Sequence, residues 1–332
     1  MPHGAHYIIF HLPKPAESFA GARPKQIWYN AGMKPIDVRS RFSAAFLKAS
    51  FASLACACAL PLSAGAKQAI RIAHIADPQI GFVTRRFPER SEACYEANYT
   101  ADLQRVEAMI PIVNAERPDL VVIAGDLVQW SKDLEAEWPR LMKKFTAPVL
   151  VVPGNHDLGQ KGALSTVHRE HLKRFVRVFG AAWGSRVVKG WRVIGVNSSF
   201  WQKLDGTAEV ASAKDRHAAW LDCELAAAKA NGEEPVVVSH IPPFVKSVDE
   251  PDSNHCIAQA IRRPLLDKAI GAGARFWLCG HEHVRSVQRY STLTILTGEA
   301  VCANLDRSPA GFNILSIPAD GPDYEWKKIR IR

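Results

Sequence analysis

Five short apolar runs in this sequence each stop at a polar residue, and no other feature limits the possible folds as much. The runs are rich in Val, Ile and Leu, which is typical of buried strands. They span residues 70–76, 120–124, 149–152, 236–239 and 276–279. Ligands of open α/β sheets bind beyond the carboxyl ends of the strands. The polar residues that follow these runs can therefore meet at one site.

Helical stretches alternate with the apolar runs, and this alternation predicts an α/β layered domain. We expect helices over residues 98–116, 135–145, 172–179, 214–230 and 257–271, and further strands over 192–196, 292–296 and 311–317. No internal repeat or low-complexity linker divides residues 67–332, so this part is predicted to be one domain. Hydrophobic residues make up 47% of the 332 positions, which is ordinary for a globular protein and sufficient for a sizeable core.

Residues 1–66 contain no such element and are predicted to be a disordered or targeting segment. Basic residues between Met33 and Lys48 precede an apolar, small-residue run at 49–62, and an Ala-x-Ala exit ends at Ala66. These are the three parts of a secretory signal peptide. We therefore expect a signal peptide from about Met33, a candidate start, to Ala66, and an exported protein that is periplasmic or secreted. The alternative is a disordered tail on a cytoplasmic protein.

The net charge of +9 is misleading as a sign of nucleic-acid binding. Residues 1–66 hold seven Lys or Arg and two acidic residues, which leaves only +4 for residues 67–332. Residues 67–332 therefore lack the strong net positive charge that is typical of domains that bind a polyanion. No nucleic-acid partner is expected. The apolar run at 49–62 is also too short for a stable membrane span.

The side chains after the five runs form an oxygen and nitrogen set that suits a divalent metal. The set comprises Asp77, Gln79, Asp126, Asn155, His156, Asp157, His240, His281 and His283. Carboxylate, amide and imidazole groups suit borderline ions such as Mn, Fe or Zn. Taken alone, Asp126 after Gly125 is more often a turn residue, and a single His240 is more often a hydrogen-bonded core histidine. The ordered series predicts a metal site.

This series resembles the motifs of the calcineurin-like metallophosphoesterase superfamily. The matching segments are Asp77-x-Gln79, Gly125-Asp126, Gly154-Asn155-His156-Asp157, His240 and Gly280-His281-x-His283, and the resemblance covers essentially all of 67–332. It implies an α/β fold, a four-layer αββα sandwich of two mixed β-sheets flanked by helices, with two divalent metal ions. Segments 76–81, 196–198 and 302–307 further resemble the group of calcineurin-like phosphoesterase domain-containing protein 1.

The same resemblance implies a role for each residue. One ion would be held by Asp77, Gln79, Asp126 and His283, and the other by Asp126, Asn155, His240 and His281. His156 would assist the leaving group, with Asp157 orienting its imidazole. The usual pattern is Asp-x-His, and Gln79 departs from it, because a neutral amide oxygen is a weaker ligand than an imidazole. The metal identity and direct binding by Gln79 are left open.

The expected activity is a metal-dependent phosphohydrolase. Two cations roughly 3.5–4 Å apart polarise the phosphoryl oxygens and lower the pKa of a shared water, so that hydroxide attacks phosphorus. The expected substrate is a phosphomonoester, either a small molecule or a phosphoprotein, with a phosphodiester as the alternative. A second hypothesis is a non-catalytic metal- or phosphate-binding module, for which Gln79 is the only hint. Retention of His156 and Asp157 favours the enzyme. The oligomeric state is left open.

Residues outside the metal set are weaker candidates for contact with the substrate. They are Arg85, Arg86, Trp130, Phe200, Trp201, Asn304 and Arg307. The remaining histidines of the body have no motif around them and are predicted to be structural or at the surface. These are His74, His168, His171, His217 and His255.

Overall fold

The computed structural model describes residues 66–82, 92–159, 164–202 and 210–331. All of them belong to one compact unit, Ala59–Arg332. The predicted signal peptide, apart from Ala66, and the candidates Arg85 and Arg86 lie outside the described residues. Among the described helices, none combines the length and the apolar character that a membrane crossing requires.

The first sheet has five strands and is mixed. Its order is β11 (Glu325–Arg330), β10 (Gly311–Ile317), β1 (Ile70–Ile75), β2 (Leu120–Ala124) and β3 (Val149–Val152). Strands β1, β2 and β3 are parallel, whereas β10 runs antiparallel to β1 and to β11. The three parallel strands therefore end at the same edge of the sheet.

The second sheet has six strands and is also mixed. Its order is β4 (Gly184–Val188), β5 (Trp191–Gly195), β6 (Glu234–Val238), β7 (Phe276–Cys279), β9 (Leu293–Thr297) and β8 (Ser286–Tyr290). The four inner strands are parallel, and the edge strands β4 and β8 are antiparallel to their neighbours.

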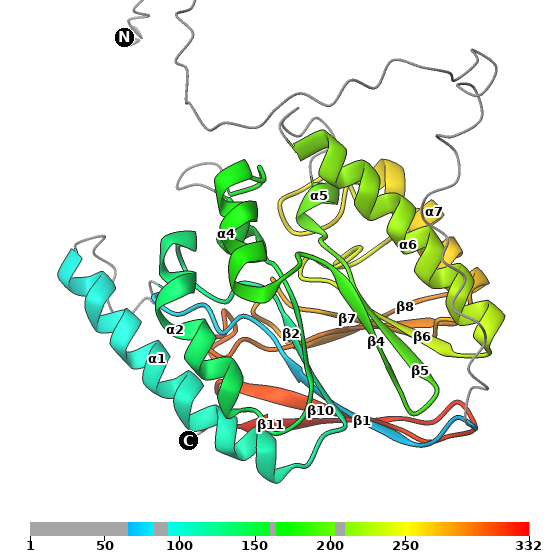
Figure 1. The fold of residues 1–332 in the computed structure, drawn as a ribbon, viewed down its shortest axis with the longest axis horizontal. Coiled ribbons are helices and arrows are strands. Elements are labelled where there is room, and N and C mark those ends of the chain that lie inside the picture. Colours follow the sequence, from blue (N-terminus) through cyan, green and yellow to red (C-terminus); the bar gives the residue numbers. More distant parts are fainter. Residues whose placement is uncertain (1–65, 83–91, 160–163, 203–209, 332) are drawn as a thin grey trace, which may run out of the picture. The chain divides into compact units, whose positions relative to one another are not determined.

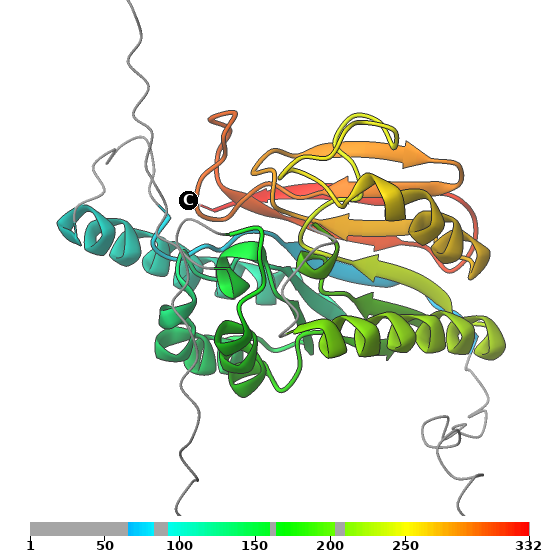
Figure 2. The same cartoon turned by 90° about the horizontal axis from the view of Figure 1, so that it is seen from above.

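Helices cover the outer face of each sheet. Helices α1 (Glu92–Ala115), α2 (Leu134–Leu141) and α4 (Arg169–Phe179) lie beside the first sheet, and α6 (Ala211–Asn231) and α7 (Gln259–Gly271) lie beside the second (Figures 1 and 2). Two short helices, α3 (Asn155–Leu158) and α5 (Ser199–Gln202), follow β3 and β5. Gly232 ends α6 in the left-handed conformation, as expected of a helix C-cap.

The alternation of side chains along the strands produces the four layers. Ile72 of β1 and Val236 of β6 point into the core between the two sheets, while Ala73 of β1 packs against α1 and Val237 of β6 packs against α6 and α7. Strands that are buried on both faces read as continuous apolar runs, which is why the sequence revealed them. The predicted four-layer αββα sandwich is confirmed.

Three strands were not predicted, and all three are edge strands. They are β4, β8 and β11, whose residues are mostly exposed or half-buried. Because only part of each strand faces a core, none carries an apolar run. Helix α1 also begins at Glu92, six residues before the expected start at residue 98.

Candidate metal centre

Loops at the carboxyl ends of five strands carry the candidate ligands. Asp77 and Gln79 follow β1, Asp126 follows β2, Asn155 follows β3, His240 follows β6, and His281 and His283 follow β7. Three of these strands belong to the first sheet and two to the second. The candidate site therefore lies where the parallel strands of both sheets end.

The tightest cluster surrounds Nε2 of His240. That nitrogen lies 3.0 Å from Oδ1 of Asn155, 3.2 Å from Oδ2 of Asp126 and 3.1 Å from Nδ1 of His281. Asp126, His240 and His281 offer ligand atoms that all lie within 4.8 Å of one another. The structure thus brings together the four residues that the resemblance assigns to one ion.

Asp77, Gln79 and His283 form a second group beside this cluster. Oδ1 of Asp77 lies 3.4 Å from Nε2 of His283. The Gln79 amide donates from Nε2 to Oε1 of Gln129 at 3.2 Å, and its Oε1 is 3.7 Å from Sγ of Cys302. That sulfur lies 3.8 Å from Nδ1 of His283, so Gln79 and His283 are neighbours. These are three of the four residues assigned to the other ion.

Backbone carbonyls set the orientation of the three imidazoles. A carbonyl only accepts hydrogen bonds, so Nδ1 of His240 donates to Ala124 O at 2.8 Å and Nδ1 of His283 donates to Ala303 O at 2.8 Å. His281 is reversed, and its Nε2 donates to Asn254 O at 2.7 Å. Each ring therefore turns its other nitrogen toward the carboxylates. Metal-binding histidines are held in this way.

The facing groups fit a cation. Oδ1 of Asn155, Oδ2 of Asp126 and the inward nitrogens of His240 and His281 are all acceptors when the two rings are neutral, and acceptors at about 3 Å repel one another unless a proton or a metal lies between them. Nitrogen and oxygen donors of this kind suit Mn, Fe or Zn. The residues present therefore fit a divalent ion.

The pKa values of the cluster also indicate that the site favours a positive charge. Burial alone would lower the pKa of His240, but the carboxylates of Asp126 and Asp77 outweigh it and raise that pKa to about 9. Burial and the charge of His240 together lower the pKa of His281 to about 4. Burial would raise the pKa of Asp126, and the neighbouring His240 and His156 hold it below its usual range instead. The site therefore favours one positive charge on the His240 side.

Five of the candidate ligands have left-handed backbone conformations. The φ angles are 48° at Asp77, 32° at Gln79, 47° at Asp126, 75° at His281 and 50° at His283. Only nine described residues other than glycine have a positive φ. Such conformations cost about 1–3 kcal/mol each and persist where the surrounding structure enforces them. Their concentration here indicates that the loops are shaped to aim these side chains.

Asp157, which the family resemblance expects to orient His156, is hydrogen-bonded to the backbone of two loops of the site. Its Oδ1 accepts from Leu127 N at 2.9 Å, and its Oδ2 accepts from Gly154 N at 2.8 Å. The ring of His156 donates instead from Nδ1 to the carbonyl of Gln129 at 3.2 Å. Among the described residues no hydrogen bond joins Asp157 to the ring of His156, and the orienting role expected of Asp157 stays a prediction.

Close approach explains the glycine before the Asn155 loop. A β-carbon at Gly154 would collide with the carboxylate of Asp126, whose Oδ1 also accepts from His156 N at 2.9 Å. The loops after β2 and β3 can therefore touch only if residue 154 has no side chain.

Two contributors to the site were missed by sequence reasoning. Asp102, buried in α1, accepts from Gly81 N at 3.2 Å and Phe82 N at 3.0 Å, and so fixes the loop that carries Asp77 and Gln79. Burial raises the pKa of Asp102 to about 6. Gln129 contacts Gln79 through its side chain and His156 through its carbonyl. Neither residue lies in a motif that would have identified it.

The weaker candidates divide between the site and the core. The Trp130 ring lies 6.2 Å from that of His156 and so borders the site. Phe200 is buried against His217 and is a packing residue. The side chain of Asn304 bonds to the backbone of its own loop. His255, predicted to be structural or at the surface, is exposed and pairs with Glu282 at 3.1 Å beside His281. Arg307 is exposed.

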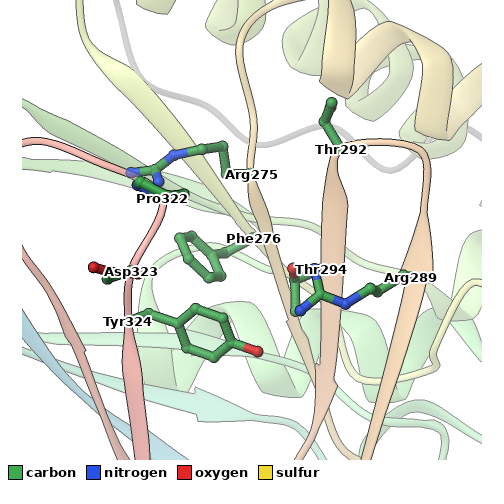
Figure 3. Close-up of a pocket in the computed structure, with 8 residues that line it drawn as sticks. All are labelled: Arg275, Phe276, Arg289, Thr292, Thr294, Pro322, Asp323 and Tyr324. Carbon is green, nitrogen blue, oxygen red and sulfur yellow. The ribbon is translucent and has the colours of Figure 1, made fainter.

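A separate pocket lies at the other end of the strands. Figure 3 shows its lining, which includes Phe276 at the amino end of β7, Thr294 of β9 and Tyr324. Arg275, at its rim, already pairs with Glu234 and donates to Gly321 O. This pocket is therefore no part of the candidate metal centre.

Comparison with known proteins decides the family. Residues 70–285 match the model of the calcineurin-like phosphoesterase family. The chain belongs to this family. It is therefore a phosphoesterase, and its fold brings together candidate metal ligands from five strand ends. The recognition made from the sequence is confirmed.

Relatives and solved structures agree with this family. The chain is 26% identical to the human serine/threonine-protein phosphatase CPPED1 over 74% of this chain and 79% of the relative. It is 28% identical to the glycerophosphodiester phosphodiesterase GpdQ of Enterobacter lignolyticus (strain SCF1) over 55% of this chain and 62% of that protein. The fold is similar to a dimetal phosphatase from Danio rerio, with a TM-score of 0.51, 14% identity and coverage of 79% of this chain and 99% of that one.

Proposed function

We propose that this phosphoesterase is a phosphomonoesterase that uses two divalent metal ions. The observation that carries the proposal is the convergence of Asp126, Asn155 and His281 on Nε2 of His240. The relative named as a serine/threonine-protein phosphatase supports a monoester, on a protein or on a small molecule, as the substrate.

The proposed ligands divide into two sets that share Asp126. Asp77, Gln79 and His283 with Asp126 would hold one ion, and Asn155, His240 and His281 with Asp126 would hold the other. Two such ions would supply Lewis-acid activation of the phosphoryl group and of the attacking water. Oδ1 of Asp126 accepts from His156 N and its Oδ2 faces His240, which supports the place of Asp126 in the set of His240. Its place in the other set is proposed from the family resemblance.

His156 is proposed to protonate the departing oxygen. Its Nδ1 is committed to the Gln129 carbonyl, which leaves Nε2 as the only ring nitrogen that can reach a leaving group. The backbone of the same residue contacts Asp126, so the ring stays next to the proposed ions. Imidazole is suited to this proton transfer near neutral pH.

Hydrolysis of p-nitrophenyl phosphate with added Mn tests this function. We expect Asp126→Asn to lower kcat/KM by more than the roughly 10–100-fold that loss of a group behind a ligand typically costs. His156→Gln should lower kcat by about 10²–10⁴-fold. The matched control is Asp222→Asn, since Asp222 is exposed and its ion pair among the described residues is with the equally exposed Lys268. Equal rates in wild type, Asp126→Asn and His156→Gln would leave the non-catalytic binding module as the surviving hypothesis.

A phosphodiesterase is the second candidate function, because one relative is named as a glycerophosphodiester phosphodiesterase. The same assay with bis(p-nitrophenyl) phosphate separates the two. A higher kcat/KM for the diester than for the monoester would replace the proposed substrate class and leave the metal centre intact.

Export is proposed on the basis of the sequence pattern at residues 33–66. Expression of the whole chain in a bacterium, followed by fractionation and amino-terminal sequencing, tests it. We expect a periplasmic or secreted product that begins at Lys67. A cytoplasmic product with an intact amino terminus would contradict export.

A further inference from the structure

The carbonyl that orients His281 belongs to a long irregular segment. Residues 239–258 connect β6 to α7, and Asn254 O within them accepts from Nε2 of His281 at 2.7 Å. The same carbonyl accepts from Nε2 of Gln202 at 2.6 Å. The direction of the His281 ring therefore depends on where this segment places one backbone oxygen.

A buried arginine on α7 holds that segment from the inside. Arg262 is 0% exposed, and its Nε donates to Ile257 O at 2.5 Å. Its Nη1 donates to Glu250 O at 2.5 Å and Val248 O at 3.3 Å, and its Nη2 donates to Sγ of Cys256 at 2.9 Å. A single guanidinium thus donates hydrogen bonds to residues on both sides of Asn254 in the chain.

This arrangement is unusual for a charged side chain. A buried charge is costly unless it is paired and hydrogen-bonded. Among the described residues, the carboxylate paired with it is that of the exposed Asp252, whose Oδ1 lies 3.8 Å from Nη2 of Arg262. Backbone carbonyls and a thiol therefore satisfy most of the guanidinium, which makes the path of the segment dependent on the five-donor geometry of arginine.

We propose that Arg262 is a positioning residue of the metal centre. It fixes the segment 248–257, the segment fixes the Asn254 carbonyl, and this carbonyl keeps the proton of His281 on Nε2 so that Nδ1 faces His240. Among the described residues no hydrogen bond or ion pair joins Arg262 to a proposed ligand, so it acts through the segment on the ion assigned to His240 and His281. The inference rests on the proposed metal centre.

The neighbouring Arg263 provides a matched control. It is exposed, lies on the same helix one residue later and over the ring of Tyr290, and contacts the segment 248–257 through the exposed side chain of Asp249 rather than through backbone carbonyls. A general effect of removing a positive charge from α7 would be the same at both positions. A positioning effect that acts through the backbone carbonyls of the segment is expected of Arg262 and not of Arg263, because an exposed ion pair such as Arg263–Asp249 contributes little.

Metal binding by the full chain tests the inference without any turnover. The protein is stripped with a chelator and titrated with Zn, and the dissociation constants of both ions are measured for wild type, Arg262→Met, Arg262→Lys and Arg263→Met. For Arg262→Met we expect one dissociation constant to rise about tenfold or more and the other to stay within about twofold, because the loss of a group that supports a ligand costs about 10–100-fold in metal affinity. The dissociation constants of Arg262→Lys should lie between those of wild type and Arg262→Met, and those of Arg263→Met should match wild type.

A spectroscopic readout tests the intermediate step. Long-range ¹H–¹⁵N spectra of the metal-free protein should show His281 protonated on Nε2 in wild type and a mixture of tautomers in Arg262→Met. If Arg262→Met does not fold, Glu250→Gln takes its place, because Glu250 caps Val245 N and Lys246 N at the start of the same segment. Unchanged dissociation constants and an unchanged tautomer in whichever variant folds would overturn the inference. A wild-type chain that binds no Zn would instead refute the proposed metal centre.

Discussion

Nδ1 of His281 lies 3.1 Å from Nε2 of His240, and the opposite nitrogen of each ring donates to a backbone carbonyl. In the neutral rings, two lone pairs therefore face each other in a buried site beside the Asp126 carboxylate. Close contact between acceptors is unfavourable, and a cation between them turns the repulsion into two bonds. The fold holds this arrangement through strands of both sheets, so the metal centre and the stability of the sandwich are coupled.

The first prediction follows from this coupling: divalent metal should raise the melting temperature of the chelator-stripped protein. A ligand at 100 times its Kd stabilises the native state by about 2.7 kcal/mol. For a domain of this size that corresponds to about 5–10 °C. Differential scanning calorimetry with Mn or Zn measures the shift. Asp126→Asn should lose at least half of it, and Asp222→Asn should keep it. Equal melting temperatures with and without metal in wild type would contradict the prediction.

The second prediction concerns Gln79, the position that departs from the family pattern. Its amide is held by Gln129 on one side and lies against Cys302 on the other, next to His283. Gln79→Ala should therefore lower the affinity for one of the two ions about tenfold or more and leave the affinity for the ion at His240 unchanged. Metal titration followed by calorimetry measures the binding of each ion separately.

The control for this prediction is Gln288→Ala, in the edge strand β8, which should leave both affinities unchanged. If Gln79→Ala also has wild-type affinities, a water or another side chain fills the position and Gln79 is no ligand. Loss of both ions together would show that the Gln79 loop supports the whole centre.

The sequence predicted the elements that are buried on both faces and missed those that are not. Strands β2 and β7 have the bounds expected from the sequence because every residue in them is buried. The edge strands β4, β8 and β11 face solvent along much of their length, so their residue types carry no apolar signal. The expected start of α1 was too late because its first six residues mix acidic residues with small and aromatic ones and show no helical period.

The candidate site was predicted where the chemistry lies in the side chain. Asp126 and His281 stand out because acidic and imidazole groups follow apolar runs. The carbonyls of Asn254, Ala303 and Gln129 orient the imidazoles, yet every residue type has such a carbonyl, so the sequence cannot mark them. Asp157 was recognised, but its hydrogen bonds to Leu127 N and Gly154 N were not predicted, because a motif names residues and does not say which backbone groups bond to them.

The third prediction separates a bracing role of Asp157 from an orienting one. Asp157→Asn replaces an oxygen that accepts from Leu127 N or Gly154 N with an amide group that cannot accept. A buried N–H group then loses its partner, at about 1–3 kcal/mol. We expect a lower melting temperature, by about 2–10 °C, together with reduced metal affinity.

The contrasting outcome for Asp157→Asn is that of a group that only orients His156. In that case stability and metal affinity would match wild type while kcat falls as it does in His156→Gln. Calorimetry, metal titration and the p-nitrophenyl phosphate assay on the same preparations distinguish the two roles.

The fourth prediction is an acid-dependent loss of stability caused by His217. Its Nε2 accepts from Asn197 N at 3.1 Å, four aromatic rings surround it, and burial lowers its pKa to about 3. The unfolded chain binds the proton near pH 6.5, so stability falls as the pH drops below 6.5 and goes on falling to about pH 3. At about 1.4 kcal/mol per pH unit, His217 contributes about 2 kcal/mol of the loss between pH 7 and pH 5.

His217→Gln tests this assignment because glutamine keeps an acceptor for Asn197 N and does not titrate. Urea unfolding at pH 7 and pH 5 should show a loss smaller than that of wild type by about 2 kcal/mol. The control is Leu225→Ala, since Leu225 is buried on the same helix and its removal should lower stability about equally at both pH values. His74, whose pKa burial lowers to about 4, adds a similar slope that remains in the variant. An unchanged pH dependence in His217→Gln would mean that the folded chain already admits a proton at this ring near neutrality.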